Sequence, residues 1–288
     1  MKKKIRFKDS KIFPLLKDKR FLAGSILLFS IVFISFSPQF FSIPYPKAGK
    51  YRPNQPPSKQ HLLGVDHYGR DWLHVLLYSV APSLYSGVLA GLIGSLIGIA
   101  IGFFSAYKGG IIDDVLRTVT DMIMVLPLWP ILVLISFSVK IYTIEQLVII
   151  LAAFSWTGAS KEIRSQVYSL KERPFIDLAK ISNFSTFQIM FLEIAPNMMP
   201  YLIIGLISSI SGSLLSLIGL QLVGLGPPGL ISLGYMLWIC QQGGYFGKGW
   251  WWFFMPPILF VIAIFIGLYL INLSLEEFSN PRIRMQKR

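Results

Sequence analysis

Long apolar runs recur along this chain, and they constrain its fold more than any other feature. Segments of this kind lie at about 21–37, 82–106, 117–139, 144–160, 196–222 and 251–273. A helix needs about 20 apolar residues to cross the hydrocarbon core of a bilayer. The sequence therefore predicts an all-α, polytopic membrane protein with about six transmembrane helices.

The positive charge follows this membrane pattern. The formal net charge is +13, although only 14% of the residues are charged. A basic protein can bind nucleic acid, but 20 of the 27 Lys and Arg residues lie in the two terminal segments and in the loops 107–117 and 161–195. By the positive-inside rule these regions face the cytoplasm. The charge thus indicates topology, with both termini cytoplasmic, and no nucleic-acid partner.

The same topology predicts how the chain is organised. We expect a basic cytoplasmic N-terminus (1–20), a first transmembrane helix (21–37), an extracytoplasmic segment (38–81), a transmembrane domain (82–273) with a cytoplasmic loop at 161–195, and a cytoplasmic tail (274–288). The length of the basic stretch favours an uncleaved first span over a signal peptide. Pro82 is predicted to begin the second helix, since proline suits a first helical turn.

The second apolar segment carries glycines that share one face of the predicted helix. Small residues on one face let helices approach closely in lipid. We therefore expect this helix to pack tightly, although glycine is also common in membrane helices generally. The residues are Gly87, Gly91, Gly94, Gly98 and Gly102.

The stretch PFIDLAKISNFSTFQIMFLEIAP, at 174–196, is too polar for a membrane span and too apolar for a plain linker. Pro174 suits a helix start, and Asn183 tolerates the left-handed conformation at a helix end. Ser185 with Gln188 predicts a capping box at a second helix. The sequence therefore predicts a helix–turn–helix at the cytoplasmic surface. The alternative is an interfacial helix that rests on lipid headgroups.

This stretch resembles a cytoplasmic loop in the membrane subunits of binding-protein-dependent ABC importers. That loop carries Glu-Ala-Ala, then Gly, then Ile-Leu-Pro, where this chain has DLA at 177–179, then Asn183, then IAP at 194–196. The segments HLLGVDHYGRDW, AYKGGIIDDVLRTVTDMIMVLP, LVGLGPPGLISLG and SNPRIR are similar to the oligopeptide/dipeptide permease family, over about residues 60–288. Leu233 stands where that family usually has Trp, and Gln221 stands near a usual Glu. The N-terminal span with a long outer segment suits the C-type subunit.

The resemblance implies a type I ABC importer transmembrane domain in the cell membrane of a prokaryote. Its implied partners are a second homologous permease subunit, two ATP-binding subunits, an extracellular substrate-binding protein and membrane lipid. In that family the loop docks into a groove on the ATPase. The contact candidates are then Phe175, Ile176, Asp177, Ala179, Asn183, Phe184 and Ser185.

The chain lacks a phosphate-binding loop of its own, because G-x-x-x-x-G-K-[ST] does not occur. The run GLGPPG at 224–229 matches G-x-G-x-x-G, but it follows an apolar span and not the strand that a dinucleotide site needs. We therefore expect no catalytic residue and no cofactor in this chain, with ATP and magnesium held by the partner subunits.

Polar residues cluster before the second span. His61, Asp66, His67, Asp71 and His74 fit no standard zinc spacing, so we expect no metal here. A structural role is preferred, in which a loop motif holds the outer segment at the membrane entry. The residues of this motif are Gly64, Asp66, Gly69, Arg70 and Asp71.

Charged residues are scarce within the predicted spans. Arg117 and Asp121 have the spacing of a helical ion pair, whereas Asp113 and Asp114 are predicted to be surface-loop charges. An ion-coupled carrier would carry ionisable residues near mid-membrane. The sequence therefore predicts an ATP-driven importer subunit, not an enzyme, for short peptides. Oligosaccharides or nickel stay open as cargo, and a lone ion-coupled secondary transporter or a non-transporting scaffold are the rival classes.

Overall fold

The computed structural model describes residues 15–279, and this part of the chain is helical apart from turns, extended segments and two isolated bridges at Val65. Most of the predicted basic N-terminus and the PRIR tail lie outside the described residues. The helices are α1 (Lys19–Ser35), α2 (Ser37–Phe40), α3 (Trp72–Lys108), α4 (Gly110–Val125), α5 (Leu128–Val139), α6 (Ile144–Lys171), α7 (Pro174–Ile181), α8 (Thr186–Gln188), α9 (Ala195–Leu222), α10 (Leu233–Gln242) and α11 (Trp251–Ser279). A short 3₁₀ helix (Leu15–Lys17) precedes α1, and a π-helical segment (Ile189–Ile194) joins α8 to α9.

The length and composition of the helices agree with a membrane protein. In the described range, three helical runs are long and apolar enough to cross a membrane: α3, the run Thr186–Leu222, and α11. The pair α4 and α5 adds a fourth if it counts as one bent span. The predicted apolar segments lie in helical regions, although the segment 117–139 is divided between α4 and α5. α1 has only 17 residues, and α6 carries several charges.

The prediction that the second helix begins at Pro82 is wrong. α3 begins at Trp72, because the Asp71 carboxylate accepts hydrogen bonds from the N–H groups of Leu73 (3.0 Å) and His74 (3.2 Å). This N-cap satisfies the free donors of the first turn. Pro82 lies inside the helix, as prolines of membrane helices can.

The third predicted span is not one continuous helix. α4 and α5 meet at an angle of 84° across Leu126 and Pro127. Leu126 has a ψ of 136°, because the ring of a following proline disfavours the helical conformation of the residue before it. The chain therefore turns sharply at Pro127.

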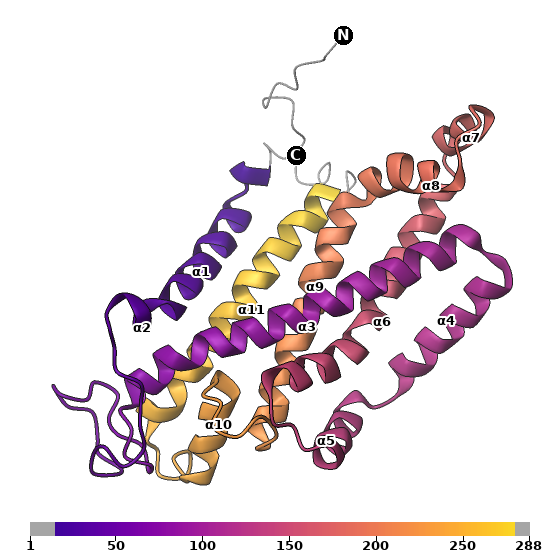
Figure 1. Ribbon diagram of the computed structural model, residues 1–288. Helices are drawn as coiled ribbons and strands as arrows, with labels where there is room; N and C mark the ends of the chain where they lie inside the picture. The colour runs from indigo at the N-terminus through magenta and orange to yellow at the C-terminus, as the bar shows by residue number, and fades with distance from the viewer. Residues whose placement is uncertain (1–14, 280–288) are drawn as a thin grey trace.

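α3 is the central helix of the bundle, and it packs mainly against α6 and α9, while α1 pairs with α11 (Figure 1). The five glycines of α3 are all buried. An added Cβ at Gly87 or Gly91 would overlap α9, and one at Gly98 or Gly102 would overlap the backbone of α6. The absence of side chains therefore sets how closely these helices approach.

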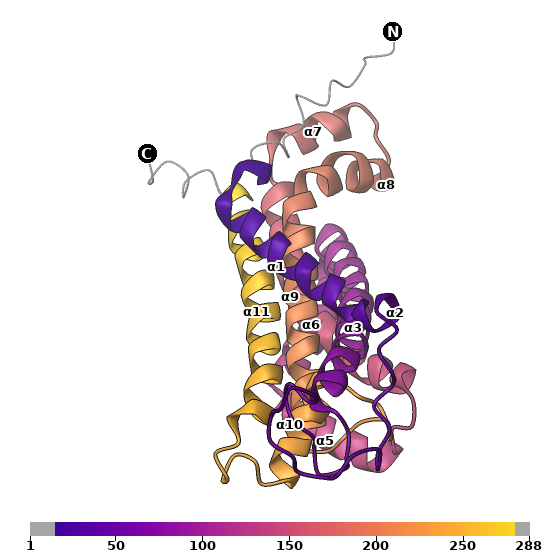
Figure 2. The same ribbon diagram turned by 90° about the vertical axis from the view of Figure 1, so that its left-hand side faces the viewer.

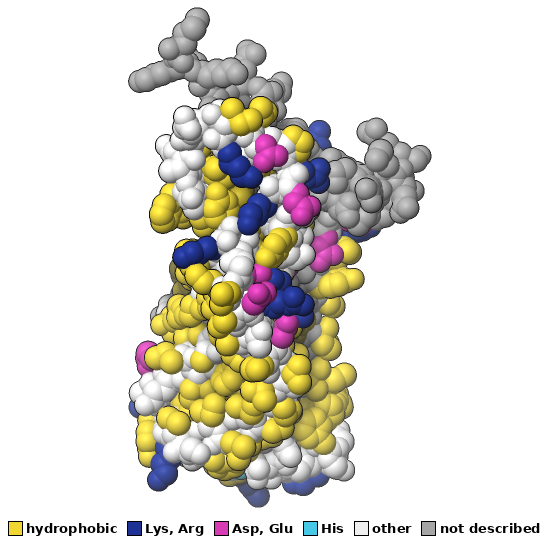
Figure 3. Space-filling view, turned by 90° about the vertical axis from the view of Figure 1, so that its right-hand side faces the viewer, with side chains coloured by type: hydrophobic (Ala, Val, Ile, Leu, Met, Phe, Trp, Pro, Cys, Tyr) yellow, Lys and Arg dark blue, Asp and Glu magenta, His cyan; other side chains and the backbone are white. Residues whose placement is uncertain are grey.

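The two ends of the bundle differ. α7 and α8 stand at one end, whereas α10 and the segment before α3 lie at the other, as Figures 1 and 2 show from two directions. On the face drawn in Figure 3, charged side chains of both signs gather toward the α7 end, the part below them is mostly hydrophobic, and a few Lys or Arg side chains lie along the bottom. An apolar body between charged ends is typical of a membrane protein.

Candidate functional site

The stretch 174–194 forms a helical hairpin that projects from the bundle. Pro174 stands in the first turn of α7, where its missing N–H costs nothing. The chain then turns at Asn183, passes through α8 and continues into α9. The helix–turn–helix that the sequence predicts is therefore present.

The turn closes with a Schellman motif. Asn183 has φ +57°, the left-handed conformation, and its N–H donates to the carbonyl of Lys180 (3.0 Å). The next N–H, of Phe184, donates to the carbonyl of Ala179 (3.1 Å). These two bonds satisfy carbonyls that the helix end leaves free. The prediction that Asn183 adopts this conformation is confirmed.

The second arm begins with the predicted capping box. The Gln188 N–H donates to Ser185 Oγ (3.3 Å), and the Ser185 N–H donates to Gln188 Oε1 (2.8 Å). The π-helical segment Ile189–Ile194 follows, just before Pro196, whose nitrogen carries no hydrogen for a helical bond. The second arm of the hairpin is therefore continuous with α9, with no loop between them.

A hydrophobic cluster anchors the hairpin to the bundle. Ile176 (0% exposed) and Ala179 (6%) of α7 pack with residues of α3, α6 and the second arm. The remaining buried members are Phe103, Ala106, Ile163, Val167, Ile189, Met190, Ile194 and Met198. The hairpin is therefore attached through its own apolar face to the ends of α3 and α6.

The outward side of the hairpin carries an unusual amount of exposed apolar surface. Leu178 and Ile181 of α7 are 65% and 79% exposed, and Phe187 and Phe191 are 69% and 63% exposed. The two phenylalanine rings stack on each other with centroids 6.4 Å apart. Contiguous exposed apolar residues mark an interaction surface more often than single ones do.

The structure separates the contact candidates into two groups. Ile176 and Ala179 are buried, and Phe175 is half-buried against the anchoring cluster. Asp177, Asn183, Phe184 and Ser185 are exposed, and Asp177 pairs with Lys180. The sequence analysis missed Leu178, Ile181, Phe187 and Phe191. Their spacing of three or four residues could have signalled a second apolar face.

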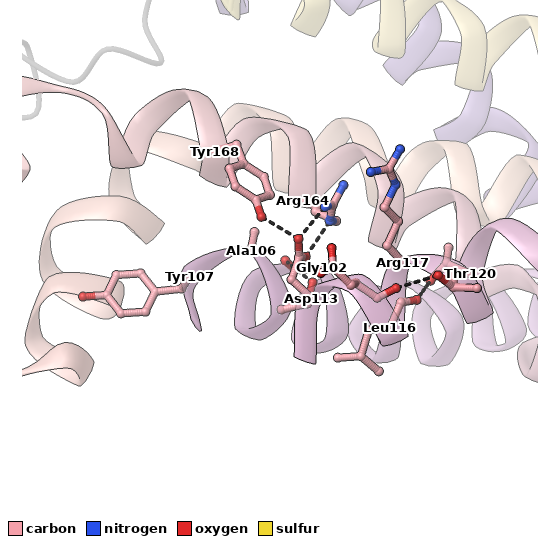
Figure 4. Close-up of polar contacts among 12 residues, drawn as sticks. Gly102, Ala106, Tyr107, Asp113, Leu116, Arg117, Thr120, Arg164 and Tyr168 are labelled. Carbon is pink, nitrogen blue, oxygen red and sulfur yellow. Dashed lines mark hydrogen bonds and ion pairs between the residues drawn. The ribbon is translucent and has the colours of Figure 1, made fainter. Parts of the chain in front are cut away.

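A polar cluster ties the elbow between α3 and α4 to α6 near the base of the hairpin (Figure 4). Arg164 Nε donates to Asp113 Oδ1 (2.6 Å), and the Tyr168 hydroxyl donates to the same carboxylate. Lys171 Nζ donates to the Tyr107 carbonyl at the end of α3 (2.8 Å). The prediction that Asp113 is a surface-loop charge is wrong, because the residue is 3% exposed. Its partner stands in another helix, which no local pattern reveals.

About two helical turns further along α4, Asp121 makes the predicted ion pair with Arg117 (3.6 Å) and a second one with Lys161 of α6 (3.2 Å). Both basic side chains are more than half exposed. Exposed pairs of this kind contribute little stability, about 0–1 kcal/mol. The buried Asp113 cluster is therefore the stronger tie between α4 and α6.

At the opposite end, the predicted loop motif lies at the start of α3. Asp66 accepts from the Arg70 N–H (2.9 Å) and from Arg70 Nε (2.8 Å), and Asp71 Oδ2 pairs with His61 Nδ1 (2.7 Å). Gly64 and Gly69 have positive φ angles, which glycine adopts without strain, so the chain can turn tightly at both positions. Among residues 15–279, the structure places no group of three or more His, Cys, Asp or Glu residues that could hold a metal ion.

The segment that contains this motif also contacts the chain between α10 and α11. The Tyr245 hydroxyl accepts the His67 N–H (2.8 Å). Burial raises the pKa of Tyr245 and lowers the pKa of His67, so both side chains stay neutral near pH 7. A neutral hydrogen bond therefore joins the two segments at this end of the bundle.

Long apolar helices with a projecting helical hairpin at one end define a polytopic membrane protein. The profile of the binding-protein-dependent transport system inner membrane component matches residues 94–285, which is more than half of the chain. The chain belongs to this family. The matched range includes the hairpin and the second part of α3, from residue 94 on.

Curated relatives agree with the family. The chain is 31% identical over 186 residues to the oligopeptide transport system permease protein OppC of Mycobacterium tuberculosis strain H37Rv, which covers 64% of each chain. It is 30% identical over 178 residues to OppC of Lactococcus lactis subsp. cremoris (62% of this chain, 60% of the relative). A putative peptide transport system permease protein of Brucella abortus is 27% identical over 275 residues, or 94% of this chain and 91% of the relative. The chain thus spans less than two thirds of the length of these OppC proteins.

Proposed function

We propose that this chain is the transmembrane permease subunit of an ATP-driven importer that translocates short peptides. Its helices form about six spans and a type I importer domain, and both termini and the hairpin lie in the cytoplasm of a prokaryotic cell. The family membership supports this reading, and the relatives' printed names, which describe oligopeptide or peptide transport, favour peptides over oligosaccharides or nickel.

The partners follow from the same proposal. A second homologous permease completes the pore, two ATP-binding subunits power it, and an extracellular binding protein delivers the cargo. The chain itself performs no covalent chemistry and needs no cofactor. ATP drives transport only if it binds one arrangement of the assembly more tightly than the other, because a ligand shifts an equilibrium by its differential affinity.

One observation carries the proposal: the hairpin is buried on one side and apolar on the exposed side. Ile176 and Ala179 attach it to α3 and α6, while Phe184 and Phe187 remain exposed. A surface docked on an ATPase would bury these side chains, and the anchoring cluster would transmit a displacement to the helices. A lone secondary transporter has no use for such a surface.

Co-purification with the ATPase subunits tests this function. We expect Asn183→Lys or Phe184→Lys to remove the ATPase from the purified complex, because each change places a charge in the docked surface. Phe246→Lys is the matched control, since Phe246 is also exposed (47%) but lies at the opposite end. Retention of the ATPase by both hairpin variants would contradict the docking role.

The side of the membrane is tested separately. In inside-out vesicles stripped of the ATPase subunits, a cysteine at 184 should react with a membrane-impermeant maleimide, and in intact cells it should not. A cysteine at 246 should show the reverse. Reaction of residue 184 from outside the cell would overturn the topology. Peptide uptake that persists without the ATPase but collapses with the ion gradient would point to a secondary transporter.

A further inference from the structure

Two segments on the side that the proposed function places outside the cell carry exposed charges of one sign only. They are 38–71, which leads into α3, and 223–250, which joins α9 to α11. Their exposed charged residues, which we call the basic outer patch, are Lys47, Lys50, Arg52, Lys59 and Lys248. The acidic residues of these two segments are Asp66 and Asp71, and both are buried. The five cations therefore give this surface a formal charge of +5.

The two buried carboxylates already have partners inside the protein. Asp66 Oδ2 accepts from Arg70 Nε (2.8 Å), and Asp71 Oδ2 pairs with His61 Nδ1 (2.7 Å). Across residues 15–279, the structure places no carboxylate within ion-pair distance of any member of the basic outer patch. The patch is therefore free to pair with anionic groups of another molecule.

Hydrogen bonds fix the two segments against each other. The Tyr51 N–H donates to the Gly69 carbonyl (3.0 Å), which attaches the start of the first segment to the loop before α3. The Tyr245 hydroxyl donates to Asn54 Oδ1 (3.3 Å), so the second segment lies beside the first. The basic outer patch is therefore one surface built from two distant parts of the chain.

Two of the cations are held on aromatic rings. Lys50 Nζ lies 5.1 Å from the centroid of the Tyr51 ring, and Lys248 Nζ lies 4.8 Å from the centroid of the Trp250 ring. Contacts between a cation and a ring position the ammonium group without neutralising its charge. The patch thus presents charges at defined places, which suits a partner with a defined surface.

The composition of the first segment favours a protein partner over the lipid surface. A segment that rests on a membrane inserts apolar side chains between the headgroups, but no large aliphatic or aromatic side chain between residues 46 and 61 is exposed. Lys and Arg are also less frequent in short loops on the outer side of a membrane protein than in cytoplasmic ones. A basic outer segment of this kind therefore calls for a role outside the membrane.

We propose, on the basis of the peptide-import function above, that the basic outer patch docks an acidic face of the extracellular binding protein that delivers the peptide. Opposite charges steer two proteins together and raise the association rate by about 10–10³-fold. Such charges act on the rate and the orientation of docking more than on affinity. The complex therefore forms quickly and still separates after each delivery.

Charge reversal tests the docking. In the complete transporter, reconstituted in phosphatidylcholine vesicles, ATP hydrolysis is measured against the concentration of its binding protein loaded with a pentapeptide. The double variant Lys50→Glu, Arg52→Glu should raise the KM for the binding protein about 10-fold at low salt and leave kcat unchanged. The exchange Lys50→Arg, Arg52→Lys keeps both charges and should behave as the wild type. An unchanged KM in the double Glu variant would overturn the proposal, and so would an equal rise in the exchange variant.

A cation outside the patch provides the matched control. Lys140 is also exposed, but it follows α5, on the other side of the bundle from the segment 38–71 (Figure 1). Lys50→Glu alone should raise the KM about 3-fold, the effect of one exposed charge pair, whereas Lys140→Glu should keep the wild-type KM. Equal increases in the two single variants would assign the effect to net charge and not to the patch, and the proposal would fall.

Salt and lipid composition separate the remaining outcomes. The wild-type KM should rise with the NaCl concentration, because salt screens exposed charges, and the double Glu variant should lose this rise. A wild-type KM that does not depend on salt would overturn the proposal. If the double Glu variant differs from the wild type only in vesicles that contain anionic phosphatidylglycerol, the patch binds lipid and the proposal falls. If the binding protein stimulates no hydrolysis by the wild-type transporter at any concentration, the peptide-import function itself fails.

Discussion

The guanidinium of Arg164 and the carboxylate of Asp113 form a two-bonded ion pair between residues 51 positions apart in the chain. The pair fixes the start of α4 against α6, next to the anchoring cluster of the hairpin. Two bonds to one carboxylate fix orientation as well as distance. The elbow between α3 and α4 and the base of the hairpin therefore form one connected unit.

Asp113→Asn is expected to destabilise this unit. The change leaves the largely buried Arg164 without its counter-charge, which costs about 2–3 kcal/mol. Thermal unfolding of the purified complex in detergent should show a lower Tm. Asp114→Asn is the control, because Asp114 is exposed and should leave the Tm unchanged. A swap, Asp113→Arg with Arg164→Asp, should recover part of the loss.

Gly102→Leu is expected to force α3 away from α6. A side chain at this position overlaps the Ser160 carbonyl, and overpacking costs about 1–3 kcal/mol or more. The amount of folded protein, measured by fluorescence-detected size exclusion, should fall. Gly158→Leu on the facing helix enters open space and should express as the wild type does. Normal expression of the Gly102 variant would show that the two helices can separate without cost.

Asn183→Val is expected to strain the hairpin turn. A β-branched residue in the left-handed region costs about 1–2 kcal/mol, whereas Asn183→Gly should be neutral or slightly stabilising. The stimulation of ATP hydrolysis by the binding protein should drop for the valine variant and persist for the glycine variant. A drop of equal size in both variants would assign the effect to the lost amide group and not to the turn.

Cys240 is expected to resist alkylation in the folded protein. The thiol is fully buried, and burial raises its pKa from 9.0 to about 12. Reaction requires the thiolate, so a maleimide should label Cys240 at pH 8 only after unfolding. A cysteine at the exposed neighbour Gln241 should react at once. Rapid labelling of Cys240 itself would show that α10 opens from the bundle.

The raised pKa of Cys240 makes the stability of the folded protein decrease as the pH rises. The folded protein holds the Cys240 proton more tightly than the unfolded chain, so the thiol favours the folded state as long as both states keep the proton. This contribution is retained below about pH 9 and is lost as the pH rises toward 12. Unfolding followed between pH 8 and 11 should show decreasing stability, and Cys240→Ala should reduce that slope.

Local chemistry explains which parts of the structure the sequence predicted. The left-handed Asn183 and the capping box at Ser185 depend on residues within a few positions, and both are confirmed. The start of the second helix was misplaced because Pro82 was read as a boundary, although Asp71 is the cap. The partner of Asp113 could not be predicted, since Arg164 approaches only when α3, α4 and α6 pack together.

The groove between α5, α6 and α9 and the exposed face of the hairpin were missed for a related reason. Gly212 looks like an ordinary small residue of a membrane helix, and only the packing of these three helices leaves open space beside it. In the same way Phe187 and Phe191 look like core residues, and it is the position of α8 that exposes them.

The run from Thr186 to Leu222 counts 37 residues, which at the rise of a helix is about 55 Å. The hydrocarbon core of a bilayer is only about 30 Å thick. A substantial part of the helical run from Thr186 to Leu222 must therefore lie outside the hydrocarbon core. If the run tilts as one unit, Phe187, next to its first residue, is displaced much further than the residues inside the bilayer.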